Sequence, residues 1–453
     1  MITLDILGIT GVKDAVKRKR LQQAAQVIAG LVLITILFAG FTGGDDLRFE
    51  HRLTSDGSLL GDLIAQIHAK LSSAGYNFAT TAVWYLWYPV LAFTVIIFGR
   101  LWCGICPVGA FAGFVNKFSL RRAYPSHLSH MWLAVGLFIL ISATERHLFR
   151  YTRSPIGTAA LLGFFIVLAV GMSLVYEKRT FCRYICPTGL ILGMYSMLAG
   201  TELRCISRKE CVLHEKKECI EGNEHGRACP LFEFPQTMER NNFCTYCTEC
   251  VRTCSKDNIR ISTRLPASDV MSLRSGSADE AFFVHSVIAV MLFLTGMEHI
   301  GYRRVVTSFV LSTGIDRTIM APVILTAVSI LAALFMYILS STKHSERRDS
   351  FVVFSYALLP MSLGVYLAAI SFKMVSGIMF IFNTIGISSG ELSSFESVHH
   401  IQSFLLLAGA AWSAYLVYDM TRRSEKSGSQ MMILLLLALY LASGLFIINM
   451  PVA

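Results

Sequence analysis

The chain has 453 residues, of which 54% are hydrophobic and only 15% are charged. Soluble domains have roughly 25% charged residues, so this composition excludes a soluble enzyme and favours several membrane spans with small water-facing parts. A net charge of +10 could suggest nucleic acid in a soluble protein, but Lys and Arg also collect on the cytoplasmic loops of membrane proteins. Because no aromatic–basic interleaving accompanies the charge, we expect a membrane partner and no nucleic acid.

Nine apolar runs approach or exceed the roughly 20 residues that a helix needs to cross a bilayer. They lie at residues 24–42, 80–98, 129–146, 157–176, 281–298, 319–340, 351–371, 397–418 and 430–449. A weaker run at 374–387 is shorter and is expected to be re-entrant or interfacial. The predicted fold class is therefore an α-helical polytopic membrane protein of about nine spans.

Clusters of basic residues predict the orientation of these spans. They occur at residues 13–20, 117–122, 177–183, 343–348 and 422–426. With nine spans and a cytoplasmic N-terminus, all of these clusters fall on the cytoplasmic side, which fits the positive-inside rule, although Arg146, Arg150, Arg153, Arg303 and Arg304 fall outside. We therefore predict a multi-pass protein of the inner (cytoplasmic) membrane.

The strongest motif is a run of four cysteines with the spacing Cys244-x2-Cys247-x2-Cys250-x3-Cys254. Three thiolates spaced in this way wrap a loop around one [4Fe–4S] cubane, and the fourth ligates the other cluster of a pair. Crossed ligation predicts a first cluster on Cys205, Cys211, Cys219 and Cys254, and a second cluster on Cys229, Cys244, Cys247 and Cys250. Zinc is the alternative for both motifs, although zinc usually takes one cysteine pair from each of two knuckles.

These cysteines lie in the one sizeable polar part of the chain. We expect residues 1–200 to form an N-terminal membrane domain and residues 201–265 an inserted ferredoxin-like α+β domain with two clusters. Residues 266–280 are then a linker, and residues 281–453 a C-terminal membrane domain of about five spans. By the predicted topology, the ferredoxin-like domain is cytoplasmic.

An internal repeat follows the second and fourth apolar runs. The copies read Arg100-x2-Cys103-x2-Cys106-Pro107-x-Gly109-x3-Gly113 and Arg179-x2-Cys182-x3-Cys186-Pro187-x-Gly189-x3-Gly193. Proline suits the first turn of a helix, so the thiols are expected at helix N-termini, where the helix dipole favours a thiolate or an anionic cluster. A third [4Fe–4S] cluster, redox thiols and a copper site all stay open, as does a close-packed hairpin with bystander thiols.

The two hairpins followed by a two-cluster segment resemble the NapH/NosR/CcoG group of membrane-bound polyferredoxins, over roughly residues 80–265. The resemblance implies a protein that passes electrons between the quinol pool or the cytoplasm and a partner redox protein. Such proteins serve nitrate or nitrous oxide reductases, or metal handling during oxidase assembly. The runs after residue 280 extend beyond the usual minimum of this family.

The C-terminal half offers a second kind of candidate site. His299 lies at the outer end of the fifth run, and His399 and His400 lie at the outer start of the eighth. Histidines at a similar depth on facing helices could bind haem b or help to form a quinone site, and Glu298 could accept a proton from a quinol. Ordinary interfacial histidines and a solvated carboxylate are the alternatives.

Three functions fit these observations. The first is an electron-transfer subunit of a quinol-linked oxidoreductase that works with a partner redox protein or reductase complex. The second is a metal (cupric) reductase or assembly factor that uses the hairpin thiols. The third is an iron–sulfur redox sensor, although the sequence contains no recognisable DNA-binding or signalling output.

Overall fold

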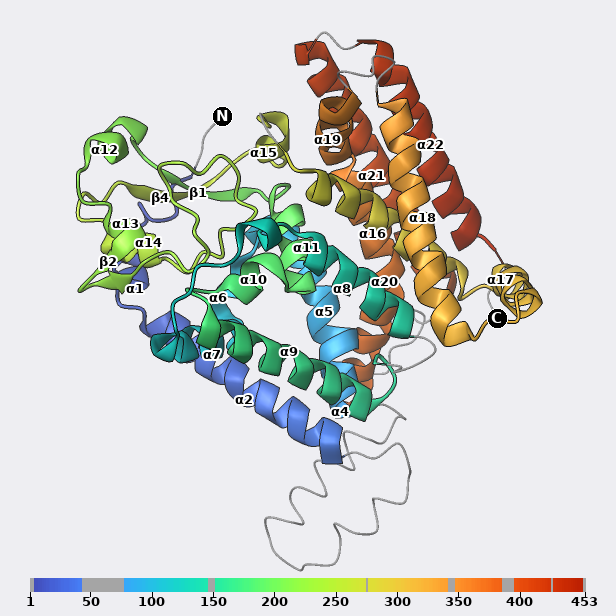
Figure 1. Cartoon of the computed structure of the whole chain (residues 1–453), viewed down its shortest axis with the longest axis horizontal. Helices are drawn as coiled ribbons and strands as arrows, with labels where there is room; N and C mark the ends of the chain where they lie inside the picture. The colour runs from blue at the N-terminus through green and yellow to red at the C-terminus, as the bar shows by residue number, and fades with distance from the viewer. Residues whose placement is uncertain are drawn as a thin grey trace, which may run out of the picture. The chain divides into compact units, whose positions relative to one another are not determined.

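The computed structural model describes residues 4–42, 77–145, 151–273, 276–340, 347–384, 395–424 and 427–450 (Figure 1). These residues group into two compact units. The first comprises Met1–Leu33, Thr94–Leu137 and Phe164–Arg274, and the second comprises Ile34–Phe93, Phe138–Gly163 and Ser275–Ala453. All twelve cysteines belong to the first unit.

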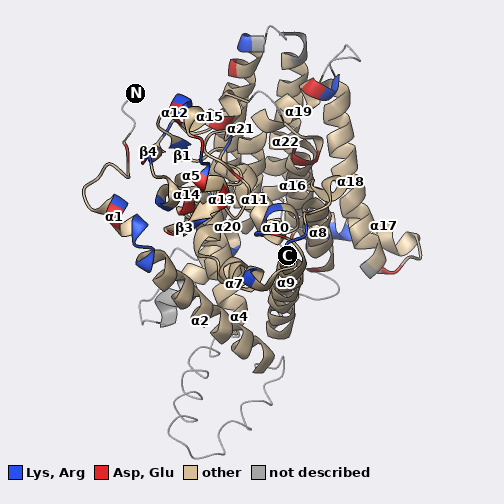
Figure 2. Ribbon diagram, turned by 60° about the vertical axis from the view of Figure 1, so that its left-hand side comes forward, with Lys and Arg blue, Asp and Glu red and all other residues tan. Residues whose placement is uncertain are grey.

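Eight helices among the described residues are long and apolar enough to cross a membrane. They cover Arg20–Thr42, Phe78–Phe98, Pro155–Val175, Ala278–Gly296, Ile319–Leu339, Leu359–Ile378, Val398–Arg423 and Gln430–Ile448. The third expected run forms the shorter helix α8 (Trp132–Thr144), whose 13 residues rise about 20 Å, less than the ~30 Å hydrocarbon core. Figure 2 shows few charged residues along the middle of the long helices. The polytopic helical fold class is confirmed, with eight full-length spans in the described part of the chain.

The run expected at 351–371 is divided between two helices, α19 (Arg347–Ala357) and α20 (Leu359–Thr384). The division falls close to Pro360, because a proline disfavours helical backbone before it and suits a first helical turn. The weaker run at 374–387 is not a separate re-entrant segment. Instead, α20 continues through it to Thr384, and residues 385–387 lie outside the described residues.

Long helices of the second unit pack side by side. They are α16 (Ala278–Gly296), α18 (Arg317–Leu339), α20, α21 (Phe395–Ser424) and α22 (Ser427–Ile448), with α17 (Ile300–Ser312) between α16 and α18 in the chain. Glycines let α20 and α21 approach closely: a Cβ added to Gly364 would lie 2.6 Å from the Leu405 carbonyl oxygen. Such small residues are typical of helix crossings in membranes.

The hairpin repeats of the first unit form pairs of short helices. The first copy gives α6 (Leu101–Ile105) and α7 (Pro107–Val115), and the second gives α10 (Thr180–Tyr184) and α11 (Pro187–Ser196). Each copy follows the end of a long helix, α5 (Tyr88–Phe98) or α9 (Pro155–Val175). The expectation that each proline opens a helix is confirmed.

The polar segment of the first unit is a small α+β arrangement. β1 (Thr201–Cys205) pairs antiparallel with β4 (Ile259–Thr263), so that Cys205 lies opposite Ile259. Between them lie α12 (Arg208–Leu213), α13 (Glu218–Glu221), the short strands β2 (Gly222–Asn223) and β3 (Gly226–Arg227), and α14 (Glu249–Thr253). The helix α15 (Ser268–Met271) follows β4.

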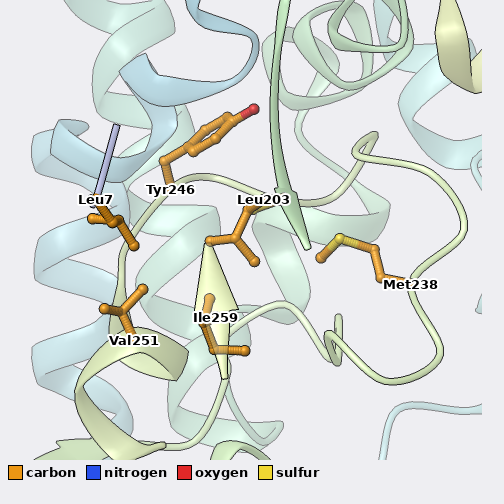
Figure 3. Packing of buried hydrophobic residues seen from close by; sticks show 7 residues of the cluster. Leu7, Leu203, Met238, Tyr246, Val251 and Ile259 are labelled. Atoms are coloured by element: carbon orange, nitrogen blue, oxygen red, sulfur yellow. The ribbon is translucent and has the colours of Figure 1, made fainter. Parts of the chain in front are cut away.

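The N-terminal segment packs on this α+β arrangement, which the sequence did not predict. The backbone N–H of Ile6 donates to the Ile261 carbonyl at 2.8 Å, and α1 (Val12–Lys17) packs against α14. Leu7 is buried in one cluster with Leu203, Val251 and Ile259 (Figure 3). Residues 4–17 therefore contribute to the hydrophobic core that packs against the cysteines of the polar segment.

Candidate metal centres

The four hairpin thiols lie close to one another. Electrostatic interactions link every pair among Cys103, Cys106, Cys182 and Cys186. Cys106 and Cys186 occupy the N-cap positions of α7 and α11. The backbone N–H of Gly189 donates to Cys186 Sγ at 3.3 Å, so a helix N-terminus faces the sulfur. The repeat thus brings four sulfurs, two from each copy, into one candidate site.

Burial controls the protonation of these thiols. It raises the pKa of Cys182 to about 12, and it raises the pKa of Cys106 and Cys186 above the ordinary value, with neighbouring thiols adding to the effect in each case. Burial therefore outweighs the backbone N–H groups of Gly109 and Gly189 at the helix N-termini, which lower the pKa of Cys106 and Cys186. A set of buried thiolates needs a cation among them, since metal binding is what removes such protons.

The arginine of each repeat copy packs against the other copy. The guanidinium of Arg100 donates from Nη2 to the Cys182 carbonyl at 2.8 Å, and a Cβ on Gly189 would lie 2.7 Å from that nitrogen. In the reverse direction, a Cβ on Gly113 would lie 3.3 Å from Arg179 Nε. The Gly-x3-Gly part of each motif therefore makes room for the arginine of the other. The sequence motifs contain both arginines but predict no role for them, because their crossing appears only in three dimensions.

The first predicted cluster set also comes together. Cys211 interacts with Cys205, Cys254 and Cys219, and burial together with these thiols raises the pKa of Cys211 to about 11. Asn258 donates from Nδ2 to Cys211 Sγ at 3.2 Å and from its backbone N–H to Cys254 Sγ at 3.3 Å. Asn258 was not predicted as part of the site, although it lies four residues after Cys254.

The second predicted set lines one cavity, which Cys229, Cys244, Cys247 and Cys250 share with apolar side chains that include Leu203, Leu231 and Phe243. Burial raises the pKa of Cys229 to about 11, with Cys247 adding to the shift. Two residues of this loop have left-handed backbone, Tyr246 at φ 50° and Thr248 at φ 59°. Non-glycine residues adopt such angles at a cost and cluster at functional sites. Thiols with N–H donors around a cavity are the donor set that a [4Fe–4S] cluster uses.

The three thiol sets follow one another within the first unit. Gly104, between Cys103 and Cys106, packs on the second set: a Cβ added there would lie 2.5 Å from the Thr245 carbonyl oxygen. Cys250 of the second set in turn interacts with Cys219 of the first. The hairpin thiols therefore adjoin the second set, and the second set adjoins the first.

A tighter grouping was not found. Within the described ranges, no three His, Cys, Asp or Glu side chains are grouped closely enough to hold a single metal ion.

The candidates in the C-terminal half belong to the second unit. His399 interacts with His299 and His400, while His299 Nδ1 lies 2.9 Å from the Met450 carbonyl oxygen. Glu298 is an electrostatic neighbour of Lys373, which is also close to Glu145. The structure thus brings the predicted residues close together and adds Lys373, which was not predicted from the sequence. The sequence alone placed Lys373 between the apolar runs 351–371 and 374–387, and only the continuous helix α20 makes it an ionisable residue within an apolar helix, which marks a functional candidate.

Comparison with known families supports an iron–sulfur protein. The family described as 4Fe-4S binding domain matches residues 80–125 and 156–204. These residues contain the two hairpins and stop before Cys205. No solved structure matches the chain.

Three curated proteins are similar to parts of the chain. YccM of Escherichia coli, by name an electron transport protein, is 22% identical over 148 residues, which cover 32% of this chain and 37% of YccM. The ferredoxin-type protein NapH of Escherichia coli is 24% identical over 183 residues, covering 36% of this chain and 62% of NapH. An uncharacterised protein of Methanocaldococcus jannaschii is 26% identical over 201 residues, covering 38% of this chain and 76% of that protein.

Proposed function

We propose that this protein, which is similar to membrane-bound polyferredoxins, passes electrons between the quinone pool, or a relay across the membrane, and a partner redox protein. The observation that carries the proposal is the gathering of twelve thiols into three sets of four within one unit. It would act as the electron-transfer subunit of a quinol-linked oxidoreductase. The substrate of that complex would belong to the partner.

Each thiol set would hold one [4Fe–4S] cluster, which takes up and releases single electrons. Cluster 1 would be held by Cys205, Cys211, Cys219 and Cys254, and cluster 2 by Cys229, Cys244, Cys247 and Cys250. A third cluster would be held by Cys103, Cys106, Cys182 and Cys186, the set covered by the 4Fe-4S family match. The contact of Gly104 with Thr245 and the interaction of Cys250 with Cys219 support the order third cluster, cluster 2, cluster 1.

A quinone would be handled in the second unit. His299, His399 and His400 could donate to its carbonyl oxygens, and Glu298 could accept the protons that a quinol releases on oxidation. Haem b on the same histidines is the alternative, and an α band in the reduced optical spectrum would reveal it. The positive-inside rule supports an inner-membrane location with the ferredoxin-like segment in the cytoplasm.

A second candidate function rests on the hairpin site. Four soft thiols that converge at one place also suit Cu(I). In this alternative, the protein is a cupric reductase or assembly factor whose two ferredoxin-like clusters deliver electrons to copper at Cys103, Cys106, Cys182 and Cys186.

Anaerobic purification with iron and sulfide counts and EPR tests these proposals. Three cubanes correspond to about twelve irons and twelve sulfides per chain, and two cubanes to about eight of each. About twelve would support the full proposal. About eight, together with stoichiometric copper bound only when the hairpin cysteines are intact, would favour the copper function. A preparation that holds zinc and no sulfide would overturn both.

A further inference from the structure

Arg100 is a buried cation whose side-chain contacts are two backbone carbonyls and one sulfur. Its side chain is 1% exposed, and its guanidinium contacts the Cys182 carbonyl, the Asn242 carbonyl at 3.0 Å and Cys103 Sγ at 3.4 Å. Among the described residues, no carboxylate pairs with it. Two other buried arginines of the same unit do have one: Arg252 pairs with Glu249 at 2.8 Å, and Arg264 pairs with Asp269 at 2.5 Å.

A lone buried charge of this kind requires a counter-ion. Arginine stays protonated in proteins, and moving an unpaired charge into the interior costs several kcal/mol even after relaxation. The acidic groups that these contacts place beside Arg100 are hairpin thiols: its Nε donates to Cys103 Sγ, and its Nη2 donates to the backbone carbonyl of Cys182. The positive charge of Arg100 is therefore balanced only when these thiols carry negative charge.

The repeat supplies a second cation from the opposite side. Arg179 lies over Gly109 and Gly113 of the first copy, and a Cβ added to Gly109 would lie 3.4 Å from Arg179 Nη1 and 3.8 Å from Cys182 Sγ, so this guanidinium also lies beside the hairpin thiols. Like Arg100, it has no acidic partner among the described residues. The two-copy repeat thus places one guanidinium from each copy beside the hairpin thiol set, Arg100 at Cys103 Sγ and Arg179 near Cys182 Sγ.

We infer that Arg100 and Arg179 are the counter-ions of an anionic redox centre on Cys103, Cys106, Cys182 and Cys186, and that they set its reduction potential. This inference rests on the proposed third cluster. Four thiolates around a [4Fe–4S]2+ core have a net charge of about −2, which two guanidiniums balance. A disulfide among these cysteines would be neutral and would leave Arg100 unbalanced, so the arginines favour a cluster over redox thiols.

The charge change on reduction gives the direction of the effect. One electron enters the centre, no bond breaks and no proton is needed, so the site becomes more negative by one charge. Both guanidiniums stabilise that reduced form more than the oxidised form. Removing either charge should therefore shift the potential of the hairpin centre to more negative values and leave clusters 1 and 2 nearly unchanged.

The test is an EPR-monitored redox titration of the full chain, purified anaerobically in detergent, for wild type, Arg100→Gln and Arg100→Lys. We expect a negative shift for Arg100→Gln, a smaller shift for Arg100→Lys, and a larger one for Arg100→Gln combined with Arg179→Gln. The matched control is Arg252→Lys, at a buried arginine that contacts the Cys247 carbonyl, which should leave the hairpin potential unchanged.

Iron counts separate the outcomes. If Arg100→Gln loses about four irons and Arg100→Lys keeps them, the counter-ion role of Arg100 is supported. If both variants lose the same number of irons, Arg100 acts through its shape and not its charge, and the counter-ion role is overturned. About twelve irons with an unchanged potential in Arg100→Gln would overturn this inference alone. About eight irons in the wild type would overturn the third cluster and this inference together.

Discussion

Asn258 contacts two sulfurs of the first thiol set. It donates to Cys211 from its side chain and to Cys254 from its backbone, so one residue contacts thiols that are 43 positions apart in the sequence. Hydrogen bonds to sulfur stabilise its negative charge and help to set a cluster's potential. At the scale of single residues, the crossing of the two cysteine motifs is thus supported by a contact that spacing alone could not reveal.

Replacing each of the two crossed cysteines by serine in turn tests this arrangement directly. Cys254→Ser should weaken or remove cluster 1, with a loss of up to about four irons, and leave cluster 2 intact, because Cys254 lies with Cys205, Cys211 and Cys219. Cys229→Ser should do the reverse. EPR of each variant, with iron counts, measures the outcome. If Cys254→Ser instead removed the cluster of Cys244, Cys247 and Cys250, ligation would be uncrossed.

At the scale of secondary-structure elements, the sequence predicted the helices and spans whose positions follow from local sequence patterns. Apolar length located the spans, and Pro107 and Pro187 located the starts of α7 and α11. The sequence did not predict the pairing of Leu4–Ile6 with β4, because that pairing joins residues more than 250 positions apart. The cysteine sets followed from spacing, but the crossing of Arg100 and Arg179 required the packing of two helical pairs.

The docking of α1 depends on charge and should respond to pH. Burial tends to raise the pKa of Glu249, but Lys19, at 2.7 Å, and Arg252 outweigh it and hold that pKa below its usual value. The stabilisation is therefore present at neutral pH and is lost as the pH falls through the lowered pKa. Lys19→Met should reduce the protection of residues 4–17 by about 1–2 kcal/mol at pH 7.

Hydrogen exchange of the N-terminal amides, compared at pH 7 and in the acid range, measures this effect. The control Lys216→Met replaces an exposed lysine and should change nothing. Equal protection in Lys19→Met and wild type at pH 7 would mean that apolar packing of Leu7, not charge, holds the segment.

The packing of α6 on the cysteine loop predicts a strict requirement for glycine. In Gly104→Ala, the new Cβ would clash with the Thr245 carbonyl, so we expect a loss of about 1–3 kcal/mol in stability, typical of overpacking. Cluster 2 should be released at a lower temperature, as followed by its visible absorbance. The matched control is Gly171→Ala in α9, where a Cβ meets nothing within 4 Å. The requirement for glycine at position 104 is contradicted if Gly104→Ala and Gly171→Ala release the cluster at the same temperature.

At the scale of the whole molecule, the candidate chemistry is divided between two units. The first contains every cysteine, and the second contains Glu298, His299, His399 and His400. If the proposed function holds, electron uptake and proton release from a quinol can therefore be impaired separately. A chemical reductant would supply electrons to the proposed clusters directly, whereas quinol-driven reduction would also need the proposed quinone residues of the second unit.

This division predicts that Glu298→Gln slows quinol-driven reduction of the clusters by roughly 100-fold, the usual contribution of a positioned base. Stopped-flow absorbance with a water-soluble quinol measures that rate, and reduction by dithionite should keep its wild-type rate. His399→Ala should behave in the same way, because His399 interacts with His299 beside Glu298. The control Glu224→Gln removes an exposed carboxylate of the first unit and should leave both rates unchanged. Unaltered rates of quinol-driven reduction in Glu298→Gln and His399→Ala would mean that these residues are ordinary interfacial side chains. Quinol oxidation would then have to take place at another site.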